Sequence, residues 1–216
     1  MKTKKNIVKM VTISILTAIT IVLQAVGSNI HFGPYSPALA LIPITIGAIL
    51  FGPLAGTWLG FVFGLVILFS PDCTTFYAIS IPGTVITVLG KGSIAGLAVG
   101  WIYKGLKRYN PIVAIIVASL FTPIVNSVLF RVGIVTFFYQ MLSSSATKNN
   151  ASTFVYLFIG LTGVNFFVEF GINAVLSPVI ARICQQGARQ LHLDDEKIFD
   201  AQAEKRSMKK NKKEEI

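Results

Sequence analysis

The sequence predicts an all-α, polytopic membrane protein, a bundle of six transmembrane helices with both termini in the cytoplasm. Of its 216 residues, 53% are hydrophobic and only 13% are charged, whereas about 25% of the residues of a soluble domain are charged. The apolar residues fall in long blocks, and about 20 helical residues suffice to cross the hydrocarbon core of a bilayer. These observations exclude an ordinary cytosolic enzyme.

The apolar blocks predict spans at about 8–27, 38–52, 54–70, 82–103, 111–139 and 153–183. The second block is short, and the tight turn at Gly52-Pro53 indicates that it acts with the third as one hairpin. Segments 28–37, 70–81 and 140–152 are expected outside: the first is rich in turn formers, the second has two β-capable stretches, and 143–152 is polar and expected to be mobile. Residues 1–183 are expected to form the membrane domain, and 184–216 a basic, solvated cytoplasmic tail.

The positive charge sets the predicted orientation. The net charge is +10, and sixteen of the nineteen basic residues lie near the N-terminus, between Lys104 and Arg108, or after Ala181. All three groups fall inside if the number of spans is even, as the positive-inside rule favours. This clustering argues for contact with a lipid bilayer and against nucleic acid as the partner.

Small residues recur at helical spacing in two of the predicted spans. The spacing of four places each set on one helix face, where small side chains let helices approach closely in lipid. Structural packing is the favoured interpretation, and a sliding surface for a partner protein is the alternative. Ser14 and Ala18 form a shorter pair of the same kind on the first span. The two longer sets are Gly52, Gly56, Gly60 and Gly64, and Gly92, Gly96 and Gly100.

Three ionisable residues interrupt the apolar spans: Lys91, Arg131 and Glu169. Each costs about 2.5–3.5 kcal/mol near a helix centre on insertion scales, so such residues normally face the bundle interior or a wet cavity. Asn165, Glu169 and Asn173 follow at i, i+4 and i+8, which places them on one face of the sixth span.

Together with Asn126 on the fifth span, these residues predict a site for a small polar organic molecule rather than a bare ion. A buried Lys91–Glu169 pair that only locks helices together is the alternative. Arg131 is five residues from Asn126, about 140° around the helix, so the two line one pocket only if it lies between neighbouring helices.

Catalysis has little support in the sequence. No nucleophile elbow, metalloprotease motif or nucleotide-binding loop is present. Cys73 and Cys184 are expected near opposite faces of the membrane as unpaired thiols. No cofactor is expected in this chain, and if ATP drives transport, another chain must bind it.

Three stretches carry a resemblance to a known family. The runs LALIPITIGAILFGPLAGTWLGFVFGLVILF (39–69), GTVITVLGKGSIAGLAVGWIYKGLK (83–107) and TPIVNSVLFRVG (122–133) resemble the substrate-binding S components of energy-coupling factor (ECF) vitamin transporters. The resemblance covers the chain from Lys9 to about Arg182. It implies a subunit that captures a vitamin from outside and works with a transmembrane coupling protein and two cytoplasmic ATPases.

The resemblance also implies roles for individual residues. The family's Ala-x-x-x-Ala contact with the coupling protein reads Ser14-x-x-x-Ala18 here, which is a conservative departure. The pattern is most similar to the pantothenate type, for which Lys91 and Asn126 match the expected ligand positions. Thr75 and Phe76 in the outer segment complete the expected ligand contacts. Riboflavin or folate remains an alternative ligand, and a membrane scaffold or an intramembrane enzyme an alternative class.

Overall fold

The computed structural model describes residues 2–30, 36–149, 152–161 and 163–190, and these contain helices and no strand. The predicted all-α class is therefore confirmed for this part of the chain. The helices are α1 (Lys2–Gly27), α2 (Leu41–Phe51), α3 (Pro53–Leu68), η1 (Pro71–Cys73), α4 (Thr74–Tyr77), α5 (Ile81–Leu106), α6 (Pro111–Phe137), α7 (Tyr139–Lys148), α8 (Thr153–Val155), η2 (Tyr156–Leu161) and α9 (Gly163–Gln190).

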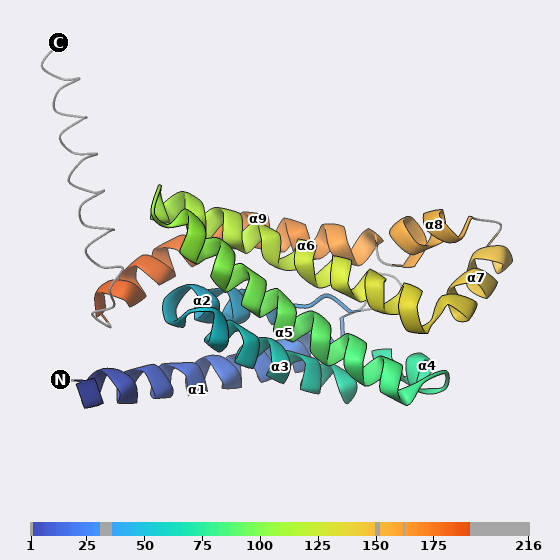
Figure 1. Ribbon diagram of the computed structural model, residues 1–216, viewed down its shortest axis with the longest axis horizontal. Helices are drawn as coiled ribbons and strands as arrows, with labels where there is room; N and C mark the ends of the chain where they lie inside the picture. Colours follow the sequence, from blue (N-terminus) through green and yellow to red (C-terminus); the bar gives the residue numbers. More distant parts are fainter. Residues whose placement is uncertain (1, 31–35, 150–151, 162, 191–216) are drawn as a thin grey trace, which may run out of the picture.

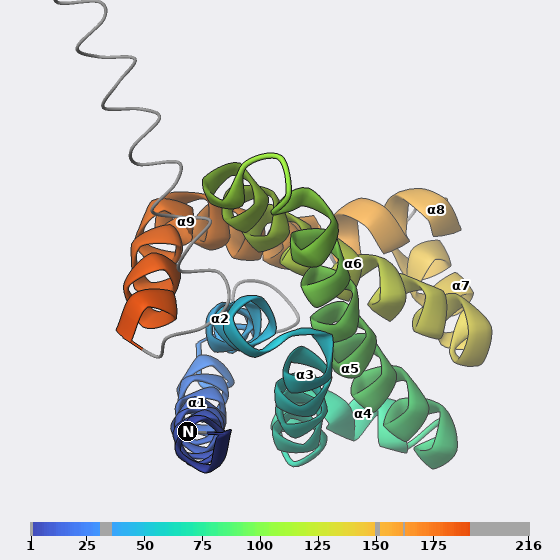
Figure 2. The same cartoon turned by 60° about the vertical axis from the view of Figure 1, so that its left-hand side comes forward.

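The long helices run roughly along one axis of an elongated bundle (Figure 1). The short helix α2 lies at its centre and packs against α1, α3, α5, α6 and α9 (Figure 2). Most of its residues are buried, including Leu41 and Ile44 with no exposed surface. This uniformly apolar sequence suits a helix surrounded by protein.

Local sequence determines where two of the long helices begin. The Ser80 side chain accepts a hydrogen bond from the Gly83 N–H (3.2 Å) at the start of α5. The Asn110 side chain accepts from the Ile112 and Val113 N–H groups (3.1 and 3.3 Å) at the start of α6. These caps satisfy N–H groups that have no partner within the helix.

Backbone contact between α3 and α5 is the closest packing in the bundle. Gly60 lies directly on the carbonyl of Gly92, and Gly56 lies in the same way on Gly96. A Cβ on Gly64 would lie only 2.9 Å from the Val88 carbonyl oxygen. The glycine pattern therefore packs these two helices together, as the favoured interpretation expected.

The turn between α2 and α3 requires its glycine. Gly52 has φ 91° and ψ 179°, a backbone conformation that is essentially restricted to glycine. Pro53 follows as the first residue of α3, where its fixed φ suits a helix start. The predicted tight turn at Gly52-Pro53 is therefore present.

Three predicted segments differ from the structure. The predicted span 153–183 is divided into α8, the π-helical η2 and α9, with residue 162 between the last two outside the described residues. Part of the expected mobile segment 143–152 belongs to α7, and the expected β-capable stretches of 70–81 form η1 and α4. Helices α4 and α7 pack on a second apolar cluster, which includes Phe76, Phe138 and Leu142, and this packing stabilises them as helices.

The last described helix reaches past the predicted end of the membrane domain. Helix α9 continues beyond residue 183 to Gln190, and the domain boundary at 183/184 stays a prediction. The solvated tail predicted for the rest of the chain, residues 191–216, lies outside the described residues.

Helix lengths bear on the predicted count of six spans. Within the described residues, α1, α5, α6 and α9 contain segments long and apolar enough to cross a membrane, and a fifth span results if α3 is joined to η1 and α4 across a bend of 76°. Helix α2 has 11 residues and rises about 16 Å, half of a bilayer core. Helix α2 is therefore too short to count as a span by length, and the structure gives four or five candidate spans where the sequence predicts six.

The glycine contact leads to a test of stability. Gly60→Leu is expected to lower the melting temperature and the yield of folded protein, because the side chain would push α3 from the Gly92 backbone at a cost of about 1–3 kcal/mol or more. Gly90→Leu is the control, since a Cβ there meets nothing within 4 Å. A thermal unfolding curve in detergent checks both, and equal melting temperatures would contradict the close contact.

Candidate functional site

A cavity lies between α1, the segment before α2, the end of α3, the η1–α4 region, α5, α6 and α9. Its volume is about 60 Å³. Its walls are Gln24, Ser36, Ala38, Ile67, Asp72, Cys73, Phe76, Val88, Lys91, Asn126, Ser127, Phe130, Asn165, Phe166 and Glu169.

Glu169 projects from α9 into this cavity and is 7% exposed. Its Oε1 accepts a hydrogen bond from the Ala38 N–H (3.0 Å). Asn126 of α6 lines the same cavity and lies near this carboxylate. Its other oxygen, Oε2, is buried and accepts no hydrogen bond from the described residues. One half of the carboxylate therefore anchors the segment before α2, and the other half is available to a ligand.

The predicted stripe on α9 is only partly in the cavity. Asn165 lines it one turn before Glu169, and its Oδ1 is buried without a hydrogen-bond partner among the described residues. Asn173 is buried one turn further along the helix and does not line the cavity. Its Nδ2 donates instead to the Glu169 backbone oxygen (2.9 Å). Asn173 thus stays with its own helix, although the spacing placed it on the same face.

Lys91 enters the cavity from α5 and lies over aromatic rings. Its Nζ is 4.5 Å from the Phe130 ring centroid and 5.8 Å from that of Phe63. Such cation–π contacts stabilise an ammonium by about 0.5–2 kcal/mol. Lys91 lies in the field of Glu169, yet within the described part of the chain the two form no direct ion pair. The ammonium therefore keeps donors for an anionic group.

Arg131 lies on a different side of α6. Its guanidinium packs over Phe158 (4.9 Å) and Phe166 (5.5 Å), and it lines a separate, mainly apolar hollow with residues of α6, α8 and η2. Phe166 itself lines the cavity and not this hollow. The five-residue separation from Asn126 places the two side chains in different pockets.

The η1–α4 region contributes one of its two predicted residues. Phe76 lines the cavity and packs edge-on against Phe138 (5.0 Å between centroids) and Phe130 (6.1 Å). Thr75 is exposed and takes no part in the cavity wall. Consecutive residues of a helix point about 100° apart, so Phe76 is buried while Thr75 is exposed.

Several cavity residues were not singled out from the sequence. Gln24 is a buried polar residue of α1, and an amide in an otherwise apolar span is a signal that could have identified it. Asp72 is the only acidic residue of segment 70–81, and its carboxylate accepts hydrogen bonds from the Ser36 N–H and hydroxyl. Phe130 follows Asn126 at i+4 on α6, and this spacing could have placed it on the same face. No local pattern marks Ser36, which tertiary packing brings here.

Cys73 lines the cavity as a free thiol, and Cys184 is a free thiol buried in α9. Cys73 lies beyond the end of α3, and burial raises the pKa of its thiol to about 11. The protonated thiol is a poor nucleophile at neutral pH. Among the described residues, no group of three or more His, Cys, Asp or Glu side chains is placed to hold a metal ion.

The proposed partner contact lies away from the cavity. Ser14 and Ala18 are exposed on α1, beside apolar side chains such as Ile15 and Val22 that are also exposed. Since α1 packs only against α2 and α3 among the main helix contacts, this face is open to lipid or to another protein.

Comparison with known proteins supports a family assignment. The family model described as "ECF transporter, substrate-specific component" matches residues 8–181, which is most of the chain. No curated protein and no solved structure matched. The matched region includes every residue that lines the cavity. With this match, the chain belongs to the family of substrate-specific components of ECF transporters.

Proposed function

We propose that this chain captures a small water-soluble vitamin, best matched by pantothenate, from outside the plasma membrane. It releases the vitamin inward together with a transmembrane coupling protein and two cytoplasmic ATPases. Family membership supports the broader role, a substrate-binding membrane subunit of an ECF importer. The observation that carries the finer proposal is the cavity in which Lys91 meets the amides of Asn126 and Asn165.

The cavity chemistry is suited to pantothenate. A carboxylate would find the ammonium of Lys91, and charge-assisted hydrogen bonds of this kind are among the stronger ones. The hydroxyls and amide of the same molecule match the two asparagines. Riboflavin and folate types remain second candidates, because Phe76, Phe130 and Phe166 line the cavity and flat rings stack well on aromatic side chains.

Binding requires the cavity to enlarge. Its volume of about 60 Å³ is small for a vitamin, since ligand pockets are typically several hundred Å³. Phe76, Phe130 and Phe166 are large side chains of the cavity wall, so their outward rotation would enlarge it.

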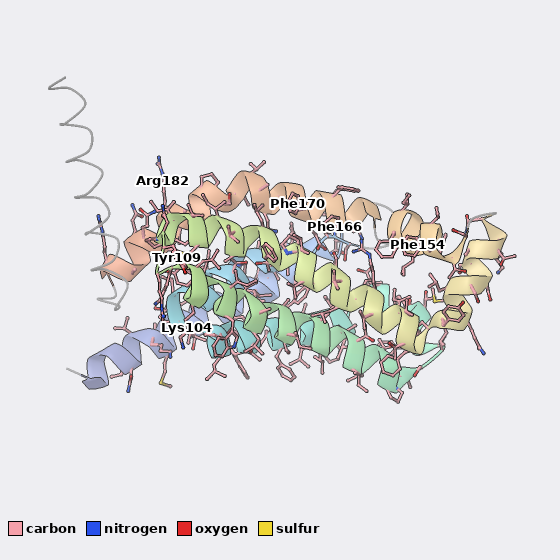
Figure 3. The ribbon with its side chains drawn as sticks, turned by 45° about the horizontal axis from the view of Figure 1, so that its top comes forward. Lys104, Tyr109, Phe154, Phe166, Phe170 and Arg182 are labelled. Atoms are coloured by element: carbon pink, nitrogen blue, oxygen red, sulfur yellow. The ribbon has the colours of Figure 1, made fainter. Side chains whose placement is uncertain are left out.

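We further propose six spans with both termini inside, counting α2 as a short central span. Lys104 and Arg182 lie at one end of the bundle, and Phe154 lies at the other (Figure 3). The basic end would then face the cytoplasm. This orientation puts η1, α4, α7 and α8 on the outer side, next to the cavity that receives the vitamin.

A membrane scaffold or an intramembrane enzyme is the alternative class. A scaffold has no need for a buried carboxylate and ammonium that face a shared cavity, since each is costly to place in an apolar span. An enzyme needs an activated group, and the high pKa of Cys73 argues against this cavity thiol as a catalytic nucleophile. Transport therefore accounts for the site better.

The ligand assignment leads to a binding test. Lys91→Ala and Asn126→Ala are each expected to weaken pantothenate binding about tenfold or more, because each removes a buried hydrogen-bonding group worth about 1.5–3 kcal/mol to a charged ligand. Isothermal titration of the purified protein measures the affinity. Lys104→Ala, an exposed lysine outside the cavity, should leave it unchanged. Unaltered binding in both cavity variants would defeat the assignment.

The transport role leads to a test of assembly. In cells that contain ECF machinery, the tagged chain is expected to co-purify with a pair of ATPases. Ser14→Trp and Ala18→Trp should abolish this co-purification, because a bulky side chain prevents close helix contact. Val175→Trp is the matched control, since Val175 is 76% exposed on α9. Recovery of the ATPases with every variant would exclude this face of α1 as the contact.

A further inference from the structure

The polar atoms left without partners in the cavity are of one chemical kind. Among the described residues, the buried unpartnered atoms of cavity-lining side chains are Gln24 Oε1, Asn126 Oδ1, Asn165 Oδ1 and Glu169 Oε2. All four are oxygens, and they come from α1, α6 and α9. Buried acceptors of this kind cost about 1–3 kcal/mol each when nothing donates to them. Such a cluster indicates a ligand rich in hydrogen-bond donors.

Glu169 is a less ambiguous hydrogen-bond acceptor than the three amide side chains. An amide can exchange its oxygen and nitrogen by turning about its terminal bond, whereas both oxygens of a carboxylate accept. Oε1 is already engaged by the Ala38 N–H at 3.0 Å, whereas Oε2 is buried without a hydrogen-bond partner among the described residues, on a side chain that lines the cavity. The charges of the lining also favour a ligand with hydrogen-bond donors, because the cavity holds one ammonium, that of Lys91, and two carboxylates, those of Asp72 and Glu169.

We propose that Glu169 is the specificity-determining acceptor of this site, and that the ligand presents a hydroxyl or N–H group to its Oε2. The proposal rests on the proposed function, since it assigns the group by which the captured molecule is recognised. Asn126 and Asn165 accept from further donors of the same ligand. The ligand thus has one end suited to the Lys91 ammonium and another with hydroxyl or N–H groups, and an analogue without those donors is rejected.

Glu169→Gln gives a sharp test, because it separates recognition from anchoring. The Gln side chain has the same shape, and its carbonyl oxygen can still accept from the Ala38 N–H. Its amide nitrogen then occupies the place of Oε2, so that a donor would face the ligand's donor. A site built for a ligand hydroxyl or N–H loses much of its affinity when that hydrogen bond cannot form. Binding is expected to weaken by about a hundredfold, with an unchanged melting temperature.

The experiment uses the full chain in nanodiscs with three probes, which are pantothenate, riboflavin and folate. Affinities are measured for the wild type, Glu169→Gln and the control Ser177→Ala. Ser177 lies on α9 outside the cavity and donates to the Ala174 carbonyl, so its variant should bind as the wild type does. The vitamin that binds is then compared with its form methylated at the hydroxyl or N–H groups, which should bind the wild type at least about tenfold more weakly.

The outcomes separate the two claims. Wild-type binding that survives Glu169→Gln unchanged would overturn the acceptor role alone, because Glu169 would then act as a donor or only anchor Ala38. Full binding of the methylated vitamin would also overturn it. A wild-type chain that binds none of the three probes and carries no small molecule by mass spectrometry would overturn the proposed function together with this inference.

Discussion

The backbone contact between α3 and α5 determines where the charged part of the cavity lies. Gly60 and Gly92 touch through their backbones, and Lys91 is the residue next to Gly92 in the sequence. Phe63, one turn after Gly60 on α3, lies under the Lys91 ammonium and would also contact any side chain at position 92. In lipid, where apolar burial drives helix association little, such close packing supplies much of the attraction. The same seam therefore holds the bundle together and fixes the depth of its cation.

The charged groups of the site are held by few and specific contacts. A carboxylate and an ammonium inside apolar spans each cost about 2.5–3.5 kcal/mol on insertion scales. Glu169 recovers part of this cost through the Ala38 N–H and the nearby Asn126, and Lys91 through the Phe130 ring. A direct ion pair would stabilise the two charges more fully, but it would occupy the groups that a ligand needs.

Hydropathy and spacing were enough to predict much of this molecule. The all-α class was predicted correctly, because lipid forces each span to satisfy its own backbone as a helix. The tight turn at Gly52 and the glycine packing were also predicted correctly, since only glycine permits that backbone conformation and that close a contact between helices. Lys91, Asn126, Asn165 and Glu169 were also predicted to meet, since polar residues in apolar spans have few places to face. Phe76 joins them in the cavity wall.

Other features depend on tertiary packing and left no clear signal in the sequence. Arg131 and Asn173 have the right residue type and spacing, but a neighbouring aromatic ring and a backbone oxygen occupy them instead. Thr75 and Phe76 are neighbours in the one-turn helix α4, and the sequence alone does not tell which of the two side chains points into the bundle. Ser36 and Asp72 meet across 36 residues of chain, and no local pattern reports such a contact.

The shortness of α2, which weakens the count of six spans, is what allows the site to form. Because α2 begins only at Leu41, residues 36–38 enter the bundle without helical hydrogen bonding. The N–H groups of Ser36 and Ala38 therefore donate to the side chains of Asp72 and Glu169. Had the second span been a full-length helix, its own carbonyls would have taken these N–H groups. Glu169 would then have lost the donor that orients one of its oxygens.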